Sequence, residues 1–278
     1  MPDTATAPSP APVTTVRARL ELEAEAPSEA ALLLAVARRP GQRVVAEELR
    51  VEGPDGPVDV TAVEAGDGAV LHRFTAPAGG TAVAYAATVR AGRRTGQRLG
   101  ALERWELTRP SRYCPSDRLG AFAAREFGEV PRAQLPAAVA AWVHERLEYV
   151  PGSSSPTDTA LETLLARQGV CRDYAHVTTA LLRALDVPAR LCSAYAPGLS
   201  PMDFHAVVEA APEGTWEVVD ATRLAPRPAL LRIATGRDAA DTAFLTTSGP
   251  VRLEAIEVLA VVEGELPRDE HGPGAALP

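Results

Sequence analysis

The chain carries the stretch GVCRDYAH at residues 169–176, and the rest of the sequence can be interpreted outward from it. Within this stretch Cys171 follows a short Gly-Val joint and begins a run with the apolar pattern of a buried helix. Backbone N–H groups at a helix N-terminus lack partners and carry partial positive charge, which favours a thiolate over a thiol. Cys171 is therefore a candidate nucleophile.

Two later stretches offer the partners that such a cysteine needs. FHAVVEA begins at residue 204 and TWEVVDAT begins at residue 215, and both patterns predict strands. The residues PEG at 212–214 predict the turn between them. With a short turn near Pro212 and Glu213, His205 pairs with Asp220, and both side chains lie on one face. Cysteine, histidine and aspartate would then be nucleophile, base and the group that orients the base.

Helices are predicted around the cysteine. Helical periodicity extends from Leu135 to Tyr149, and Thr159 with Glu162 forms a capping box for a short helix. The helix that begins near Cys171 is expected to stop at the Val-Pro pair of residues 187–188. Strands are predicted afterwards at 189–196, 204–211 and 215–220.

The first third of the chain predicts a different structure. From Thr14 to Thr108, short alternating segments are separated by turns rich in Gly, Pro and Asp, which is typical of an antiparallel β-sandwich. His72 is the one residue of a likely catalytic type in this region, and a single strand histidine is interpreted as structural.

The predicted organisation has five parts and is α+β overall. Residues 1–13 and 265–278 are predicted to be disordered tails, 14–108 an N-terminal β-sandwich domain, 109–118 a linker, and 119–264 a catalytic domain with a final strand at 251–262.

Composition narrows the range of partners. The chain has 28 basic and 36 acidic residues, for a net charge of −8, and it has no basic block. We therefore expect no nucleic-acid partner. No apolar stretch is long enough to span a bilayer, so no membrane association is expected. The first residues lack the basic and apolar regions of a signal peptide, and the expected location is cytoplasmic.

Two missing residue types exclude several kinds of site. The sequence contains no lysine, which excludes a P-loop lysine, a Schiff-base lysine and a Ser-x-x-Lys nucleophile. It also contains no asparagine, which excludes a Cys-His-Asn site. The third member of a cysteine triad in this chain must be Asp or Glu.

The other cysteines and histidines are given structural interpretations. Cys114 and Cys192 lack a helix terminus and are expected to be inert, although a bridge between them is left open. His176, five residues after Cys171, is interpreted as a packed or hydrogen-bonded helix residue. A metal set of Cys171, His176, His205 and Asp220 lacks the usual ligand spacing, so we predict no metal and no cofactor.

Four stretches together resemble the bacterial transglutaminase-like family, whose members are often described as cysteine proteases. They are GVCRDYAH, PMDFHAVVEA, TWEVVDATRLAP and RIATGRDAAD, within a resemblance that covers roughly Ser111 to Leu253. The resemblance implies a papain-like α+β core, with the cysteine on a central helix packed on an antiparallel sheet. It also implies that Cys171, His205 and Asp220 are catalytic in acyl transfer at an amide.

Three functions follow from this interpretation. The preferred one is a cysteine peptidase or amidase that acts on peptide or protein amides with water as the acceptor. The alternatives are an amine-accepting acyl transferase and a non-catalytic binding module on the same fold. Asp220 is expected to hold the Nδ1–H of His205, and Tyr149 is predicted to donate to the oxyanion beside the Cys171 N–H. The sequence predicts neither the substrate identity nor the oligomeric state.

Overall fold

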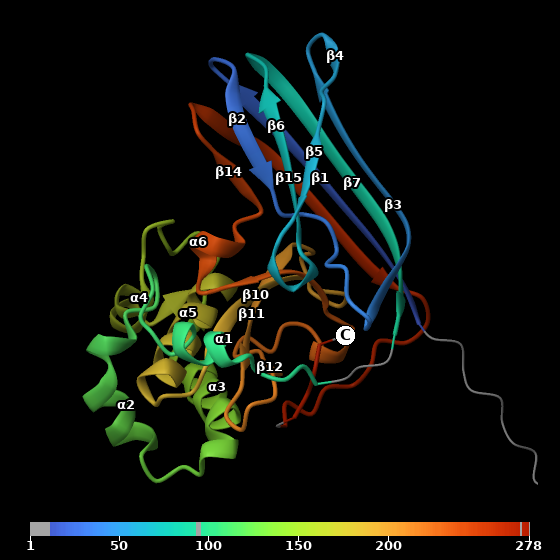
Figure 1. Cartoon of the computed structure of the whole chain (residues 1–278). Coiled ribbons are helices and arrows are strands. Elements are labelled where there is room, and N and C mark those ends of the chain that lie inside the picture. Colours follow the sequence, from blue (N-terminus) through green and yellow to red (C-terminus); the bar gives the residue numbers. More distant parts are fainter. Residues whose placement is uncertain (1–11, 93–95, 273, 278) are drawn as a thin grey trace, which may run out of the picture.

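The computed structural model describes residues 12–92, 96–272 and 274–277 (Figure 1). A long β-sandwich stands against a second part, here called the helical part (residues 101–244), in which helices surround a small sheet. Apart from one short parallel pair, the described strands are paired antiparallel, which agrees with the predicted α+β class. The predicted tail at 1–13 lies mostly outside the described residues, and Val13 begins the first strand.

Two sheets form the sandwich. The first has the order β15 (Val251–Val262), β1 (Val13–Ala24), β7 (Gly79–Ala91), β3 (Gln42–Gly53) and β4 (Gly56–Pro57). The second has the order β14 (Leu245–Thr247), β2 (Ser28–Leu32), β6 (Val70–Ala76) and β5 (Thr61–Glu64). On β1 the residues Val16, Ala18, Leu20 and Leu22 alternate with polar ones and are buried, so one face of the strand fills the core between the sheets.

The end of the chain corrects the predicted domain boundaries. The strand at 251–262 was predicted in the catalytic domain, but it is β15 and pairs with β1 along its length, from Thr14 opposite Val262 to Ala24 opposite Val251. Periodicity identifies a strand without identifying its partner, and this partner lies more than two hundred residues away. The sandwich is therefore completed by both ends of the chain (Figure 1).

Three further boundary predictions were wrong. Residues 101–106, predicted within the sandwich, form a helix, α1 (Ala101–Glu106). The predicted linker 109–118 contains the fully buried Cys114 and the 3-10 turn η2 (Ser116–Arg118). The predicted C-terminal tail packs on the helical part, because Asp269 forms an ion pair with Arg227 at 2.8 Å and Leu277 is buried.

The helical part contains one central helix and one four-stranded sheet. The helix is α5 (Cys171–Ala184), and the sheet has the order β12 (Glu217–Val219), β11 (Phe204–Ala210), β10 (Ala189–Tyr195) and β13 (Leu231–Gly236). Around them lie α2 (Gly120–Phe127), α3 (Leu135–Arg146), α4 (Ala160–Ala166) and α6 (Ala239–Thr242), with the paired segments β8 (Glu148–Tyr149) and β9 (Gln168–Gly169). The 3-10 turns are η1 (Gly66–Gly68), η3 (Arg132–Gln134) and η4 (Arg227–Ala229). No helix within the described ranges is long and apolar enough to cross a membrane.

The start of α5 is set by two residues that flank the cysteine. Asp173 lies in the first turn, and its carboxylate accepts the N–H of Val170 at 2.8 Å. A Cβ at Gly169 would lie 2.7 Å from the Cβ of Asp173, so only glycine allows this approach. The cap therefore fixes Cys171 as the first helical residue.

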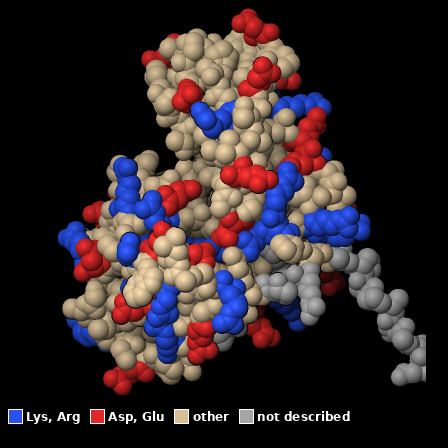
Figure 2. All heavy atoms as spheres, viewed as in Figure 1, with Lys and Arg blue, Asp and Glu red and all other residues tan. Residues whose placement is uncertain are grey.

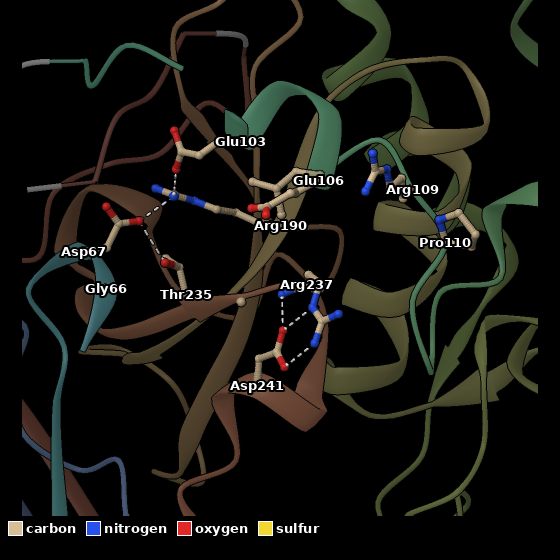
Figure 3. Close-up of a pocket in the computed structure, with 12 residues that line it drawn as sticks. Gly66, Asp67, Glu103, Glu106, Arg109, Pro110, Arg190, Thr235, Arg237 and Asp241 are labelled. Atoms are coloured by element: carbon tan, nitrogen blue, oxygen red, sulfur yellow. Dashed lines mark hydrogen bonds and ion pairs between the residues drawn. The ribbon is translucent and has the colours of Figure 1, made fainter. Parts of the chain in front are cut away.

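A buried ionic cluster joins the sandwich to the helical part (Figure 3). Arg190 of β10 contacts Glu209 of β11 at 2.9 Å and Glu103 of α1 at 3.0 Å, and it also pairs with Asp67 of the sandwich. Arg232 of β13 pairs with the same Glu209. Arg190, Asp67 and Glu103 line a cavity of about 500 Å³ together with residues outside the cluster, such as the paired Arg237 and Asp241. The charged groups of the cluster pair with one another, and the contact of Arg190 with Asp67 connects the helical part to the sandwich.

The face seen in Figure 2 carries acidic and basic side chains interspersed over both parts. On this face the described residues form no continuous basic surface of the kind that binds nucleic-acid phosphates.

Glu209 is predicted to be critical for stability. Its side chain is 2% exposed and pairs with two buried guanidinium groups, and Glu209→Gln would leave Arg232 without a counter-charge while Arg190 keeps Asp67 and Glu103. We expect the free energy of unfolding in urea to fall by about 3 to 5 kcal/mol. The matched control is Glu254→Gln in the exposed pair with Arg252, which should change it by less than about 1 kcal/mol. Equal, small effects of both substitutions would contradict the role of the cluster.

Candidate active site

Cys171 lies in an open cavity between the two parts of the molecule. The cavity has a volume of about 520 Å³, and His205 also lines it. Leu33 and Leu245 contribute to its wall from the sandwich side, and Phe244 lies beside them. Of the three cysteines, all free thiols, Cys171 alone is partly exposed. A ligand can therefore reach its sulfur.

His205 and Asp220 form a buried pair behind the cysteine. The ring Nε2 of His205 lies 2.8 Å from Oδ2 of Asp220, and the two side chains are 0% and 1% exposed. The other carboxylate oxygen, Oδ1, accepts the backbone N–H of Thr222 at 2.8 Å and its hydroxyl at 2.7 Å. Both oxygens of Asp220 are thus engaged, which fixes the carboxylate and, through it, the imidazole. Sequence reasoning missed Thr222.

The predicted strand register was wrong by two residues, although the contact forms. Val208 lies opposite Val219, so the same register would place His205 opposite Thr222 instead of Asp220. Gly214 has a φ of +78° and lets the hairpin turn one residue later than predicted. Because side chains alternate with a period of two, this shift keeps His205 and Asp220 on one face as diagonal neighbours.

The predicted ring nitrogen was also wrong. Asp220 lies diagonally beyond the ring, so Nε2 reaches it where Nδ1 was expected. The Nδ1 atom is buried and has no hydrogen bond that satisfies normal geometry among the described residues. An interaction with Cys171 contributes to the ionisation of His205, so Nδ1 is the nitrogen left for the thiol.

The local charges favour an imidazolium. Burial lowers the pKa of His205, but the Asp220 carboxylate, its hydrogen bond and Cys171 outweigh burial and raise the pKa to about 10. For Asp220, burial acts to raise the pKa, yet His205 and Thr222 hold it below the ordinary value. At neutral pH the pair is therefore a cation and an anion in contact.

Tyr149, the predicted oxyanion donor, lies close to the start of the cysteine helix. Its strand β8 runs parallel to β9, with Tyr149 opposite Gly169, two residues before the cysteine. Burial and the charge of Cys171 raise the pKa of Tyr149 to about 12. The hydroxyl therefore keeps its proton at neutral pH and can donate it in a hydrogen bond.

The other candidate residues have structural surroundings. His176 stacks on Tyr113 with ring centroids 5.1 Å apart, and its Nε2 accepts the N–H of Ala239 at 3.2 Å, which confirms a packed, hydrogen-bonded histidine. Burial lowers the pKa of His176 to about 4. Cys114 and Cys192 are fully buried in separate clusters, so they do not form the bridge left open by the sequence. Within the described ranges no three His, Cys, Asp or Glu residues are grouped to hold a metal ion.

Cys171 should be the reactive thiol of this protein. Burial raises the pKa of Cys114 and of Cys192 to about 12, and neither sulfur is accessible. We expect iodoacetamide at neutral pH to modify Cys171 well ahead of the other two, as measured by peptide mapping. His205→Ala should slow this labelling because the imidazolium is lost. Equal rates at all three cysteines would exclude the ion-pair arrangement.

The His205–Asp220 pair should make stability depend on pH in a defined direction. The pKa of His205 rises from 6.5 to about 10, so its contribution is complete below pH 6.5 and is lost as pH rises through about 10. The lowered pKa of Asp220 means that its contribution is lost as pH falls below its ordinary value of 3.8. We expect the difference in unfolding free energy between the wild type and His205→Gln to shrink from neutral pH to about pH 10. A difference that grows over this range in urea denaturation would contradict the assignment.

A family model and several known proteins are similar to this chain. The model of the transglutaminase-like superfamily matches residues 122–221. The crystal structure of a putative cysteine protease from Cytophaga hutchinsonii is 30% identical, with a TM-score of 0.85 and coverage of 94% of each chain. The periplasmic domain of TgpA from Pseudomonas aeruginosa bound to ethylmercury is more distant, at 19% identity and a TM-score of 0.43 over 78% of this chain and 92% of that chain.

A curated relative from Mycobacterium leprae, an uncharacterized protein, is 27% identical over 162 residues. The match covers 54% of this chain and 57% of the relative, so it spans little more than half of either protein. The similarity to the Cytophaga protein, in contrast, extends over nearly the full length of both chains. With the match of the family model to residues 122–221, this similarity shows that the protein belongs to the transglutaminase-like superfamily.

Proposed function

We propose that this protein is a thiol enzyme that cleaves peptide or protein amides through a thioester on Cys171. The observation that carries the proposal is the buried His205–Asp220 pair, at 2.8 Å, behind a cysteine that begins a helix and lines an open cavity. The similar Cytophaga protein is named a putative cysteine protease, which supports the same reaction class.

In the first half of the reaction the cysteine replaces the amine. The Cys171 thiolate attacks the amide carbonyl and forms a C–S bond, giving a tetrahedral oxyanion. His205, protonated at Nδ1, transfers that proton to the leaving nitrogen as the C–N bond breaks. Asp220 keeps its hydrogen bond to Nε2, holds the ring in place and stabilises the imidazolium. The products are a thioester and a free amine.

Two donors are available for the oxyanion. The N–H of Cys171 lies in the first turn of α5, where no preceding helical carbonyl can accept it, and it interacts with the hydroxyl oxygen of Tyr149, which an oxyanion would replace as the acceptor. The neutral hydroxyl of Tyr149 is the second donor that we propose. Because a helix N-terminus carries partial positive charge, the same helix end would stabilise both the thiolate and the oxyanion.

In the second half of the reaction an acceptor takes the acyl group. Water, deprotonated by neutral His205, gives a free acid and makes the protein a peptidase or amidase. An amine would give a new amide and make it an acyl transferase. The apolar side of the cavity, where Phe204 stacks on Phe244 with centroids 5.3 Å apart, favours this second candidate because it limits access of water. A binding module without chemistry is the third and least favoured reading, since all three triad residues are present.

The role of Asp220 can be tested without removing the thiol. Asp220→Asn keeps the size of the side chain but cannot balance an imidazolium, so kcat/KM should fall by about 10²- to 10⁴-fold. Circular dichroism and the thermal transition should show a folded protein that still labels at Cys171. Unchanged turnover in this variant would show that another residue orients His205.

The acceptor can be identified by adding an external amine. The chain contains no lysine, so it cannot crosslink itself through lysine side chains and gives no background of that kind. With a peptide substrate and fluorescent cadaverine, we expect release of free acid to exceed incorporation of the amine, as measured by mass spectrometry. Incorporation that outruns hydrolysis would establish the transferase instead. Cys171→Ser is the control that should abolish both products.

A further inference from the structure

Asp203 is a charged residue of the active-site cavity that the proposed mechanism does not use. It lines the cavity together with Cys171 and His205. It lies two residues before His205, where side chains of an extended segment project to the same side. Its charge acts on both His205 and Tyr149, so the carboxylate lies near the reactive centre.

No cationic side chain in the described part of the chain forms an ion pair with the carboxylate of Asp203. Its one hydrogen bond is local, from the N–H of Phe204 to Oδ1 at 2.7 Å. Among the described residues it forms no ion pair, unlike the buried Asp220 and Asp67. Partial burial raises the pKa of Asp203 above its ordinary value. The side chain remains exposed to solvent in the cavity, and an unpaired anion in that position is suited to a cation from a ligand.

Two arginines, Arg112 and Arg172, also line the cavity. Arg172 is held by Asp173 at 3.0 Å and by the carbonyl of Ser155 at 2.9 Å. Arg112 lies over the ring of Tyr113, 5.2 Å from its centroid, on the segment that precedes α2. Both arginines of the cavity are therefore engaged by neighbours of their own, and among the described residues neither pairs with Asp203.

The proton transfer decides which half of a substrate meets Asp203. His205 gives its proton to the leaving nitrogen, so the amine half must lie beside His205 when the C–N bond breaks. We propose that Asp203 binds a positive charge on the amine half of the substrate, such as a basic residue that follows the scissile amide. This inference rests on the proposed function. The cation held by Asp203 takes no part in bond making or breaking. A diamine acceptor would place its non-reacting ammonium group at the same carboxylate.

A matched pair of substrates isolates this contact. Arginine and its neutral analogue citrulline are placed after the scissile amide in otherwise identical peptides, drawn from a library that the wild type turns over. We expect kcat/KM to favour arginine by about fivefold, the effect of one charge several ångströms away in a partly solvated site. Asp203→Asn should bring the ratio to about one. If Asp203 only adjusted His205, both peptides would slow equally and the ratio would persist, which would overturn the proposal.

The control removes the same charge at a distant site. Asp55 is exposed in the hairpin between β3 and β4, at the far end of the sandwich (Figure 1). Asp55→Asn should keep the wild-type preference for arginine.

A second measurement tests the cation site without turnover. Methanethiosulfonate reagents with an aminoethyl or a sulfonatoethyl group label Cys171 at rates that report the local charge. Asp203→Asn should lower the ratio of cationic to anionic labelling by about fivefold, and Arg112→Gln should raise it. If no peptide is cleaved but this ratio falls, the proposed function fails and the cation site stands. If Asp203→Asn leaves the labelling ratio unchanged, the cation site is overturned. If the substitution changes the labelling ratio but not the preference for the arginine peptide, the assignment of the site to the amine half is overturned.

Discussion

The cap at the start of α5 is the constraint on which the reactive centre depends. The carboxylate of Asp173 turns back to the N–H of Val170, and Gly169 makes room for it because it has no Cβ. The helix can then begin only at Cys171. The sulfur and the backbone N–H of Cys171 thus share the positive end of a helix whose apolar residues anchor it in the core. A side chain at position 169 would move the nucleophile.

The second requirement is a charged pair kept out of water. His205 and Asp220 are almost fully buried, where an isolated charge would be strongly unfavourable. The two hydrogen bonds from Thr222 satisfy the carboxylate oxygen that His205 does not use. The pair is therefore stable as a unit, and the ring cannot rotate without breaking its contact with Asp220. His205, Asp220 and Thr222 together fix both the orientation of the imidazole ring and its positive charge.

Strand β11 connects this centre to the junction between the two parts. His205 lies at one end of the strand, and Glu209, four residues later, holds Arg190 and Arg232. Through Arg190 the cluster reaches Asp67 of the sandwich. Because the sandwich also contributes wall to the cavity around Cys171, it is part of the candidate site as well as a neighbouring domain.

The sequence by itself determined the local structure around the candidate site. Helix start signals and the alternation of side chains depend on neighbouring residues, so they placed Cys171 at a helix start and put His205 and Asp220 on one face of a hairpin. The two-residue register shift kept that face, because the alternation has a period of two. The contact was therefore predictable even though the pairing behind it was not.

The tertiary structure alone decided the rest. The pairing of β15 with β1 depends on a partner at the other end of the chain, which periodicity cannot specify. The choice of Nε2 over Nδ1 depends on ångström-scale placement of a diagonal neighbour. The cavity that brings Asp203 next to Cys171 exists only once α5, β11 and the sandwich are packed together, because its walls come from segments that are far apart in the sequence.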